Sequence, residues 1–317
     1  GMWVAGSLIE AIGRTPVLRL TRVVGGDLEV WGKCEFMNPS GSLKDRIALY
    51  MIRAAERRGE LRPGMKLVIP TTGNTGIAFA AVGAYLGYRV VIVIPEEMSY
   101  ERMLMLRAYG AEIIHTPGGE SDVGRSLEYS RRLAEEHPEE YYFFDQWSDE
   151  ANVQAHYETT GKEILEQLGS DIDCFVAGVG TGGTLVGVAK RLKEANPDIY
   201  IVGMEPAECP MITQGKWGRH EIEGIGDGFT PEIIKRYRHL IDDWILVSSE
   251  EAIQMARRLA REEGLFLGIS SGANVVAALK IAEQKGLKRI VTVFPDYGAR
   301  YFSTRLVREK RVRPAES

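Results

Sequence analysis

The chain contains few of the residues that form covalent cross-links or metal sites. Its three cysteines, Cys34, Cys174 and Cys209, include no C-x-x-C pair, and its five histidines lack the spacing of metal ligands. This pattern indicates a reducing compartment, excludes a disulfide framework and gives no support to a metal site. Uncharged apolar runs of about 18 residues are also absent, so no membrane partner is expected. Without a recognisable signal peptide, the chain is expected to be cytoplasmic.

An excess of positive charge is missing too. Lys and Arg number 39 against 44 Asp and Glu, a formal net charge of −5, so no broad basic face for nucleic acid is predicted. The 317 residues, 44% of them hydrophobic and 26% charged, have the composition of an ordinary globular protein. This length is sufficient for two domains with large cores.

Short apolar runs alternate with longer amphipathic runs along the whole chain. A first series predicts strands at 66–69, 89–94, 112–115 and 142–144, with helices near 76–86, 99–109 and 122–136. A second series predicts strands near 173–179, 200–204, 243–247 and 289–294, with helices near 151–168, 182–195, 249–263 and 272–285. Such alternation is typical of parallel sheets with helices on both faces. We therefore expect two doubly wound, three-layer α/β domains with a ligand-binding cleft between them.

Two further signals concern helix and chain ends. Ser248 and Glu251 have the spacing of a capping box before the helix near 249. The tail from Arg305 to Ser317 carries five basic residues and a proline, and it is expected to be a frayed end.

One lysine stands at the start of an expected helix. The segment from Asn38 to Arg46 opens with helix-breaking residues, and the apolar residues after Lys44 repeat at intervals of three and four. The positive end of the helix dipole, together with burial, would lower the pKa of the Lys44 amine and favour its neutral, nucleophilic form. A neutral amine beside a cleft is what Schiff-base formation with a carbonyl cofactor requires. A solvated surface lysine is the alternative interpretation.

Three loops rich in glycine and hydroxyl groups each precede an expected helix. The segments 71–76, 178–184 and 268–274 are TTGNTG, GVGTGGT and GISSGAN. Free N–H groups at a helix start make the first loop an anion site, for a carboxylate as well as a phosphate, and glycines let the second approach a phosphate closely. In the third, Ser270 can hydrogen-bond a heterocyclic nitrogen without protonating it. Simple helix capping is the alternative for the first and third loops.

The second loop also matches a dinucleotide-binding pattern. Gly178, Gly180 and Gly183 fit G-x-G-x-x-G, and Glu205 follows at the end of the next expected strand, about 20 residues on. An NAD-dependent oxidoreductase is therefore an alternative. It assigns no role to Lys44 or to the first loop.

The lysine and the three loops together describe one ligand. An aldehyde for Lys44, a phosphate for the second loop and a ring nitrogen for Ser270 are all present in pyridoxal 5'-phosphate (PLP). With these motifs the chain resembles the fold-type II PLP enzymes, specifically the cysteine synthase (O-acetylserine sulfhydrylase) and cystathionine β-synthase family. The resemblance runs from Ile12 to Thr304. It rests on motifs in fixed order at 38–46, 71–76, 145–147 with 156–161, 180–184, 223–229 and 268–273.

The resemblance implies a role for each matching residue. Lys44 is the catalytic Schiff-base lysine, Asn74 bonds the 3-hydroxyl of the cofactor, and Ser270 bonds its pyridine nitrogen. The implied phosphate cradle consists of Gly180, Thr181, Gly182, Gly183 and Thr184. The implied substrate-binding residues are Thr71, Thr72, Gly73, Thr75 and Gln146 around the carboxylate, with Gly224, Ile225 and Gly226 lining the substrate side.

The resemblance also implies the architecture and the activity. A tryptophan synthase β-like fold would have a smaller mobile domain at 40–149, with the carboxylate loop, and a larger one at 1–39 and 150–317, with the phosphate loop. The expected reaction is β-replacement, in which O-acetyl-L-serine and sulfide give L-cysteine and acetate. The alternatives are a cystathionine β-synthase using serine or O-acetylserine with homocysteine, an O-phosphoserine sulfhydrylase, and a non-catalytic binding module. The expected partners are an amino-acid substrate with sulfide or a thiol, a second copy in a homodimer, and the C-terminus of a serine acetyltransferase.

Three residues depart from or add to the cysteine synthase pattern. Thr72 stands where serine is common, and its methyl group narrows the carboxylate site. Asp227 stands where a small residue is frequent. Arg219, nearby in the sequence, could meet a phosphate leaving group, although a loop arginine is usually a solvated surface charge.

Overall fold

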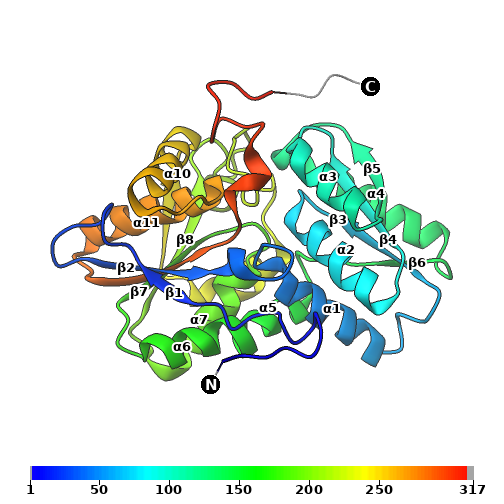
Figure 1. Cartoon of the computed structure of the whole chain (residues 1–317), viewed down its shortest axis with the longest axis horizontal. Coiled ribbons are helices and arrows are strands. Elements are labelled where there is room, and N and C mark those ends of the chain that lie inside the picture. The colour runs from blue at the N-terminus through cyan, green and yellow to red at the C-terminus, as the bar shows by residue number, and fades with distance from the viewer. Residues whose placement is uncertain (1, 313–317) are drawn as a thin grey trace.

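The computed structural model describes residues 2–312. In it, two sheets built mainly of parallel strands lie side by side, each between helices (Figure 1). The expected α/β class with two such units is confirmed. Part of the tail that was expected to fray, 313–317, lies outside the described residues. The part before it is held in place: Arg305 pairs with Glu221 and Glu250, and the N–H of Val312 donates to the Ser303 carbonyl at 2.8 Å. For 305–312 the expectation of a frayed end is therefore wrong.

The smaller sheet has four parallel strands in the order β5-β4-β3-β6. Its strands are β3 (Lys66–Pro70), β4 (Val90–Pro95), β5 (Glu112–Thr116) and β6 (Tyr141–Phe143). One face packs against α1 (Lys44–Arg57), α2 (Asn74–Leu86) and α3 (Tyr100–Ala108), and α4 (Val123–Glu136) covers the other. Every residue of β4 is buried, as expected of an apolar strand covered on both faces.

The larger sheet has six strands in the order β1-β2-β10-β7-β8-β9. They are β1 (Val17–Arg19), β2 (Glu29–Cys34), β7 (Cys174–Gly178), β8 (Tyr200–Pro206), β9 (Asp243–Val247) and β10 (Arg289–Phe294). All neighbours are parallel except β1, which runs antiparallel to β2. Neither of these two strands was predicted from the sequence. The three residues of β1 are too few to show an apolar alternation.

Helices cover both faces of the larger sheet as well. On one face lie α10 (Ser249–Glu263) and α11 (Ile269–Lys285), and on the other α5 (Glu150–Ala155), α6 (Lys162–Leu168), α7 (Gly183–Ala195) and α9 (Glu232–Tyr237). The predicted capping box opens α10: the Glu251 N–H donates to Ser248 Oγ at 3.1 Å, and the Ser248 N–H donates to Glu251 Oε1 at 3.0 Å. The short α8 (Met211–Gln214) and four 3-10 turns at Glu35–Met37, Glu120–Asp122, Arg238–Leu240 and Gly298–Tyr301 complete the elements.

The helix expected at 151–168 is not continuous. A π-helical turn, His156–Gly161, separates α5 from α6. The Thr159 hydroxyl donates to the Ala155 carbonyl at 2.5 Å, and His156 Nδ1 lies 2.9 Å from Thr160 Oγ1. Hydroxyl groups that bond within the turn compete with the regular ladder, and such turns are frequent at functional sites.

The smaller sheet lies wholly within 40–149, and the larger sheet within 1–39 and 150–317. The exact domain bounds, and the mobility of the smaller domain, stay predictions. Among the described residues no helix is both long and apolar enough to cross a membrane, and no cluster of side chains has the composition of a metal site.

Candidate active site

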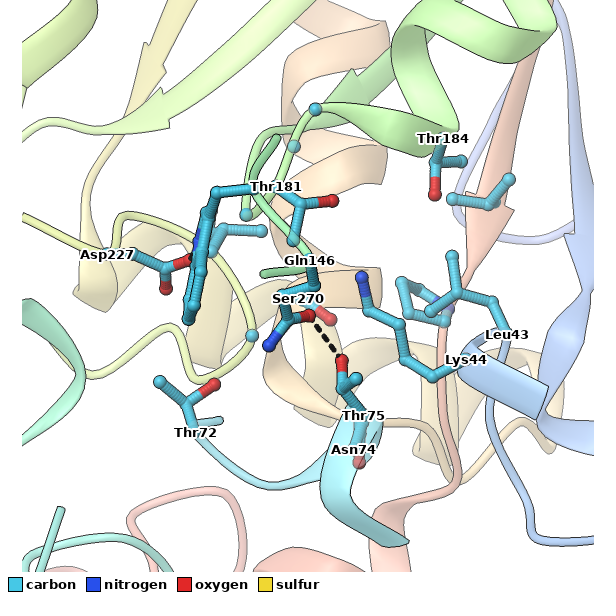
Figure 2. A pocket seen from close by; sticks show the side chains of 18 of the residues that line it. Leu43, Lys44, Thr72, Asn74, Thr75, Gln146, Thr181, Thr184, Asp227 and Ser270 are labelled. Atoms are coloured by element: carbon cyan, nitrogen blue, oxygen red, sulfur yellow. Dashed lines mark hydrogen bonds between the residues drawn. The ribbon is translucent and has the colours of Figure 1, made fainter. Parts of the chain in front are cut away.

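A cavity of about 700 Å³, including its open mouth, lies between the two sheets. Figure 2 shows side chains from both sides of the cleft turned into it. The predicted residues that line it are Lys44, Thr72, Asn74, Thr75, Gln146, Gly180, Thr181, Gly182, Thr184, Gly224, Ile225 and Ser270.

Lys44 is the first residue of α1, and its side chain extends into the cavity (Figure 2). Its Nζ makes no hydrogen bond or ion pair with any described residue. Burial lowers the pKa of Lys44 to about 8, against the opposing negative charge of the neighbouring carboxyl groups of Asp227 and Glu120 taken together. The predicted direction of the shift is therefore present, and desolvation is its main cause rather than the helix dipole. An amine with this pKa is partly neutral near neutral pH and can act as nucleophile or base.

The loop after β3 leads into the start of α2, where the sequence predicts an anion site. Thr71 Oγ1 accepts the N–H groups of Gly73 at 2.9 Å and Gly76 at 3.2 Å, so this buried hydroxyl shapes the loop and does not line the cavity. Thr75 Oγ1 donates to Gln146 Oε1 at 2.6 Å (Figure 2), and Gln146 Nε2 donates to the Pro70 carbonyl at 2.8 Å. Gln146 thereby fixes the direction of the Thr75 hydroxyl. Thr72 and Thr75 remain the cavity-facing hydroxyls of this loop.

Arg102, which was not predicted from the sequence, holds the same loop from the side away from the cavity. It is fully buried on α3, and its Nη1 donates to the Thr72 carbonyl at 3.0 Å. Its Nη2 donates to the Tyr301 hydroxyl at 2.6 Å and lies 3.7 Å from Asp296 Oδ2. A Cβ on Gly73 would come within 2.4 Å of the Arg102 side chain. Gly73 therefore serves the packing of the loop, and it does not line the cavity.

Asn74 lines the cavity but is also tied to the end of the chain. Its Nδ2 donates to Asp296 Oδ2 at 2.8 Å, and its Oδ1 accepts from Arg300 Nη1 at 2.6 Å. One amide N–H is left after these bonds. That single donor is the group available for a cofactor hydroxyl.

The loop after β7 has the shape of a phosphate cradle. Gly182 has φ +89°, and a Cβ there would come within 2.6 Å of Ile234. A Cβ on Gly180 would come within 2.5 Å of the Gly224 carbonyl oxygen, so neither position has room for a side chain. The helix α7 begins immediately afterwards, and its first N–H groups have no partner within the helix. Such a helix start attracts anions.

Behind the cradle, a neutral histidine positions a hydroxyl. His156 Nε2 lies 3.2 Å from Thr184 Oγ1. Burial lowers the pKa of His156 well below its ordinary value, assisted by Lys44 and Arg46. On the other side, Thr181 Oγ1 accepts from Asn152 Nδ2 at 2.9 Å. Gly183, the remaining cradle residue, packs against Asn152, where a Cβ would overlap its side chain, and does not line the cavity.

Ser270 is the second residue of α11 and faces the cavity (Figure 2). It is buried, and its hydroxyl makes no hydrogen bond with the described residues. The helix cap is Gly268, and Ser270 does not bond the helix end. A free hydroxyl in this position suits the nitrogen of a bound ring, so the residues present fit PLP: amine, phosphate cradle and ring partner line one cavity.

Several lining residues were not among the predicted sites. They are Leu43, Trp147, Gly178, Asp227, Asn274, Val293 and Pro295. Among the predicted ones, Gly226 packs against Pro206 and His220 behind the lining. Asp227 carried a signal of its own in the sequence, as a carboxylate where a small residue is frequent. Four others lie within the motifs or loops already singled out, without an assigned role: Leu43, Trp147, Gly178 and Asn274.

Two residues on which the alternative hypotheses depended, Glu205 for NAD and Arg219 for a phosphate leaving group, bond other parts of the chain. Glu205 accepts the N–H groups of Ile212 and Thr213 and the Thr213 hydroxyl at 2.7–3.1 Å, so it stabilises α8 and is not free to bind a ribose. Arg219 is largely exposed, pairs with Glu97 and Asp122, and lies outside the cavity lining.

The chain belongs to the family of pyridoxal-phosphate dependent enzymes, whose pattern matches residues 8–296. Within this family it is similar to the cysteine synthase of Staphylococcus aureus strain Mu50, at 46% identity over 95% of this chain and 96% of that protein. It is also similar in structure to a cysteine synthase (OASS) from Entamoeba histolytica, with a TM-score of 0.89 and 35% identity over 99% of this chain and 93% of that one. An O-acetylserine dependent cystathionine β-synthase from Helicobacter pylori has a TM-score of 0.89 and 38% identity over 96% of this chain and 99% of that one.

Proposed function

We propose that the chain catalyses β-replacement on an activated L-serine, with O-acetyl-L-serine and sulfide giving L-cysteine and acetate. The observation that carries this proposal is the unpaired Lys44 amine, which lines one cavity together with residues of the predicted phosphate cradle and the predicted carboxylate loop. The 46% identity to a cysteine synthase supports the choice of donor and nucleophile.

When bound, PLP supplies an aldehyde for the substrate amine and a conjugated ring that accepts negative charge from the α-carbon. The chain supplies the groups that bind and move protons. The Lys44 amine takes the proton from the α-carbon and later returns it, for which its lowered pKa suits it. Because Ser270 offers a neutral hydroxyl, it leaves the ring nitrogen unprotonated, which restrains the spread of charge and favours β-replacement over transamination.

The carboxylate loop orients the substrate. The cavity-facing hydroxyls of Thr72 and Thr75, and the start of α2, form the proposed site for the substrate carboxylate. Closure of the smaller lobe over this loop would exclude water from the reacting carbon.

A second candidate takes homocysteine in place of sulfide. The similarity to the O-acetylserine dependent cystathionine β-synthase favours it. O-phosphoserine has less support, because Lys44 is the sole basic side chain that lines the cavity within the described residues. A phosphate leaving group would therefore lack a cationic partner of its own.

The test is a grid of three donors, O-acetylserine, O-phosphoserine and serine, against sulfide and homocysteine, with the products identified by mass spectrometry. Cysteine from O-acetylserine and sulfide as the most rapidly formed product supports the proposal. Cystathionine as the main product selects the second candidate, and no product from any pair contradicts both.

The expected assembly and location are also proposals. We infer a homodimer in the cytoplasm, able to bind the C-terminus of a serine acetyltransferase at the open mouth of the cavity. Light scattering tests the dimer. Competition between a serine acetyltransferase C-terminal peptide and O-acetylserine tests the partner.

A further inference from the structure

A carboxylate on the far side of the cavity has no role in the chemistry described above. Asp227 lies across the cavity from Lys44, on the side of Thr72 (Figure 2). It is 6% exposed. A carboxylate so buried is costly unless partners compensate it, which makes its contacts informative.

The contacts of Asp227 are incomplete. Its Oδ2 accepts from Trp147 Nε1 at 2.8 Å, whereas its Oδ1 is buried without a hydrogen-bond donor in the described chain. Glu120 has the same deficit: its Oε1 accepts the Gly224 N–H, and its buried Oε2 has no donor. Two ionised carboxylates cannot bond each other, but a single proton between them satisfies both oxygens.

The surroundings retain this proton within the pair. Burial, followed by the charge of Asp227 and the hydrogen bond to it, raises the pKa of Glu120 well above its ordinary value, and the Gly224 N–H and Arg102 oppose this only in part. The charged and titratable groups around the pair include Arg102 on α3, Lys44 on α1, and His220 and Cys209 in the loops after β8. On its outer side Glu120 shares a second, more open pocket with further charged groups, which are Glu97, Arg219, Glu223 and Arg311. The pair thus shares one proton and carries one negative charge, and Asp227 is its member that lines the cavity.

We propose that Asp227 is a catalytic residue that takes the proton of the incoming nucleophile, so that this site uses neutral sulfur nucleophiles. The class comprises hydrogen sulfide and un-ionised thiols, as distinct from hydrosulfide and thiolate anions. Glu120 is a positioning residue that holds Asp227 through the shared proton. This inference rests on the proposed β-replacement activity and names the form of its second substrate.

Before the sulfur adds, the C–O bond to the β-carbon has broken and acetate has left with its electron pair, so that a double bond joins the α- and β-carbons. An electron pair of the sulfur then forms the bond to the β-carbon, and the pair of the double bond moves to the α-carbon, which receives the proton held by Lys44. The S–H bond breaks, and its proton moves to Asp227 Oδ2. This oxygen is the one near Gly180, 3.9 Å from where a Cβ of that residue would stand, and it retains a lone pair after accepting from Trp147. Asp227 then releases this proton to solvent. Because acetate leaves as an anion and the nucleophile is neutral, one proton is released in each turnover. The same carboxylate repels anionic nucleophiles from the cavity.

The test is the pH profile of kcat/KM for sulfide at saturating O-acetyl-L-serine, from about pH 6 to about pH 9. The enzymes are the PLP-loaded wild type, Asp227→Asn, Glu120→Gln and the control Asp171→Asn, which removes one exposed carboxylate far from the cavity. We expect the wild type to retain activity below the pKa of the nucleophile. In that pH range kcat/KM of Asp227→Asn should be about 100-fold lower than that of the wild type, the usual size of a general-base effect. It should also fall about tenfold for each unit by which the pH is lowered, because only the ionised fraction of the nucleophile reacts.

Above the pKa of the nucleophile the profiles should cross, because Asp227→Asn no longer repels the anion. Glu120→Gln keeps a donor to Asp227, so it should lower kcat/KM severalfold while keeping the wild-type shape, and the control should match the wild type. A purely structural role of Asp227 would lower its profile equally at every pH. Parallel profiles for wild type and Asp227→Asn would therefore overturn the inference while leaving the proposed function standing.

Infrared spectroscopy tests the shared proton without reference to activity. We expect a buried carboxylic-acid C=O band at neutral pH that moves in heavy water, disappears in Glu120→Gln and shifts in Asp227→Asn. Absence of this band, or its indifference to both substitutions, would refute the pair even if the wild type made no cysteine. If the band is present but no donor and nucleophile react, the proposed function fails, and the catalytic part of the inference fails with it.

Discussion

Replacing Lys44 by methionine in the cofactor-free protein should make that protein more stable at neutral pH. Methionine keeps an unbranched side chain of similar length and removes the charge. Burial lowers the pKa of the Lys44 amine from 10.5 to about 8, which at 1.36 kcal/mol per unit corresponds to about 3 kcal/mol of unfavourable free energy in the charged, folded state.

The pH dependence follows from the sign of this shift. Below about pH 8 the amine is charged in both the folded and the unfolded chain, so the full penalty is present and the variant gains about 3 kcal/mol. As the pH rises from about 8 towards 10.5, the folded form loses its proton first, and the gain disappears. The stabilisation should therefore be largest at neutral pH and small near pH 10.

Urea unfolding followed by circular dichroism at several pH values measures this effect. The control is Lys285→Met on the exposed end of α11, where less than about 0.5 kcal/mol is expected. A Lys44→Met protein that is no more stable at pH 7, or whose gain grows towards pH 10, would refute a buried, mostly desolvated amine.

Three further predictions concern the cofactor site and its support. Lys44→Ala should abolish turnover and leave the circular dichroism spectrum unchanged; β-replacement activity that persists would contradict the role of this amine. Gly182→Ala should weaken PLP binding at least tenfold in an equilibrium titration, since the residue has φ +89° and a Cβ would contact Ile234; unchanged affinity would exclude the cradle. Glu163→Gln should cost about 3 kcal/mol, because Arg46 and Lys33 outweigh burial and hold the pKa of Glu163 at about 2. That loss should be constant above pH 4.5 and vanish as the pH falls through about 2, measured by urea unfolding; a loss that persists in acid would point to packing instead.

The elements that could be predicted from the sequence are those with a local signal. β4 is a run of six apolar residues, and α10 opens with a capping box whose two bonds are present. The glycine loops before α2 and α7 could be found for the same reason, because neighbouring glycine residues indicate the backbone conformations that these loops adopt. The cavity they form was anticipated from the side chains needed for one cofactor.

The parts that could not be predicted depend on contacts between distant residues. The Arg102–Tyr301 bond joins positions 199 residues apart, and the Trp147–Asp227 bond joins positions 80 apart. No local pattern marks such a partner. The π-helical turn at His156–Gly161 was missed because its hydroxyl bonds alter a segment whose apolar spacing still reads as one helix.

The position of β10 has a consequence for how the chain is made. Among the strands in residues 2–312 this one is synthesised last, yet it lies inside the larger sheet, between β2 and β7. On the ribosome the growing chain must keep two unpaired strand edges apart until residues 289–294 have emerged. The hydrogen bonds of Asn74 to Asp296 and Arg300 form later still, because these two partners follow β10 in the chain. The smaller sheet can therefore form early in translation, whereas the contacts that hold the cleft are complete only after residue 300 has emerged.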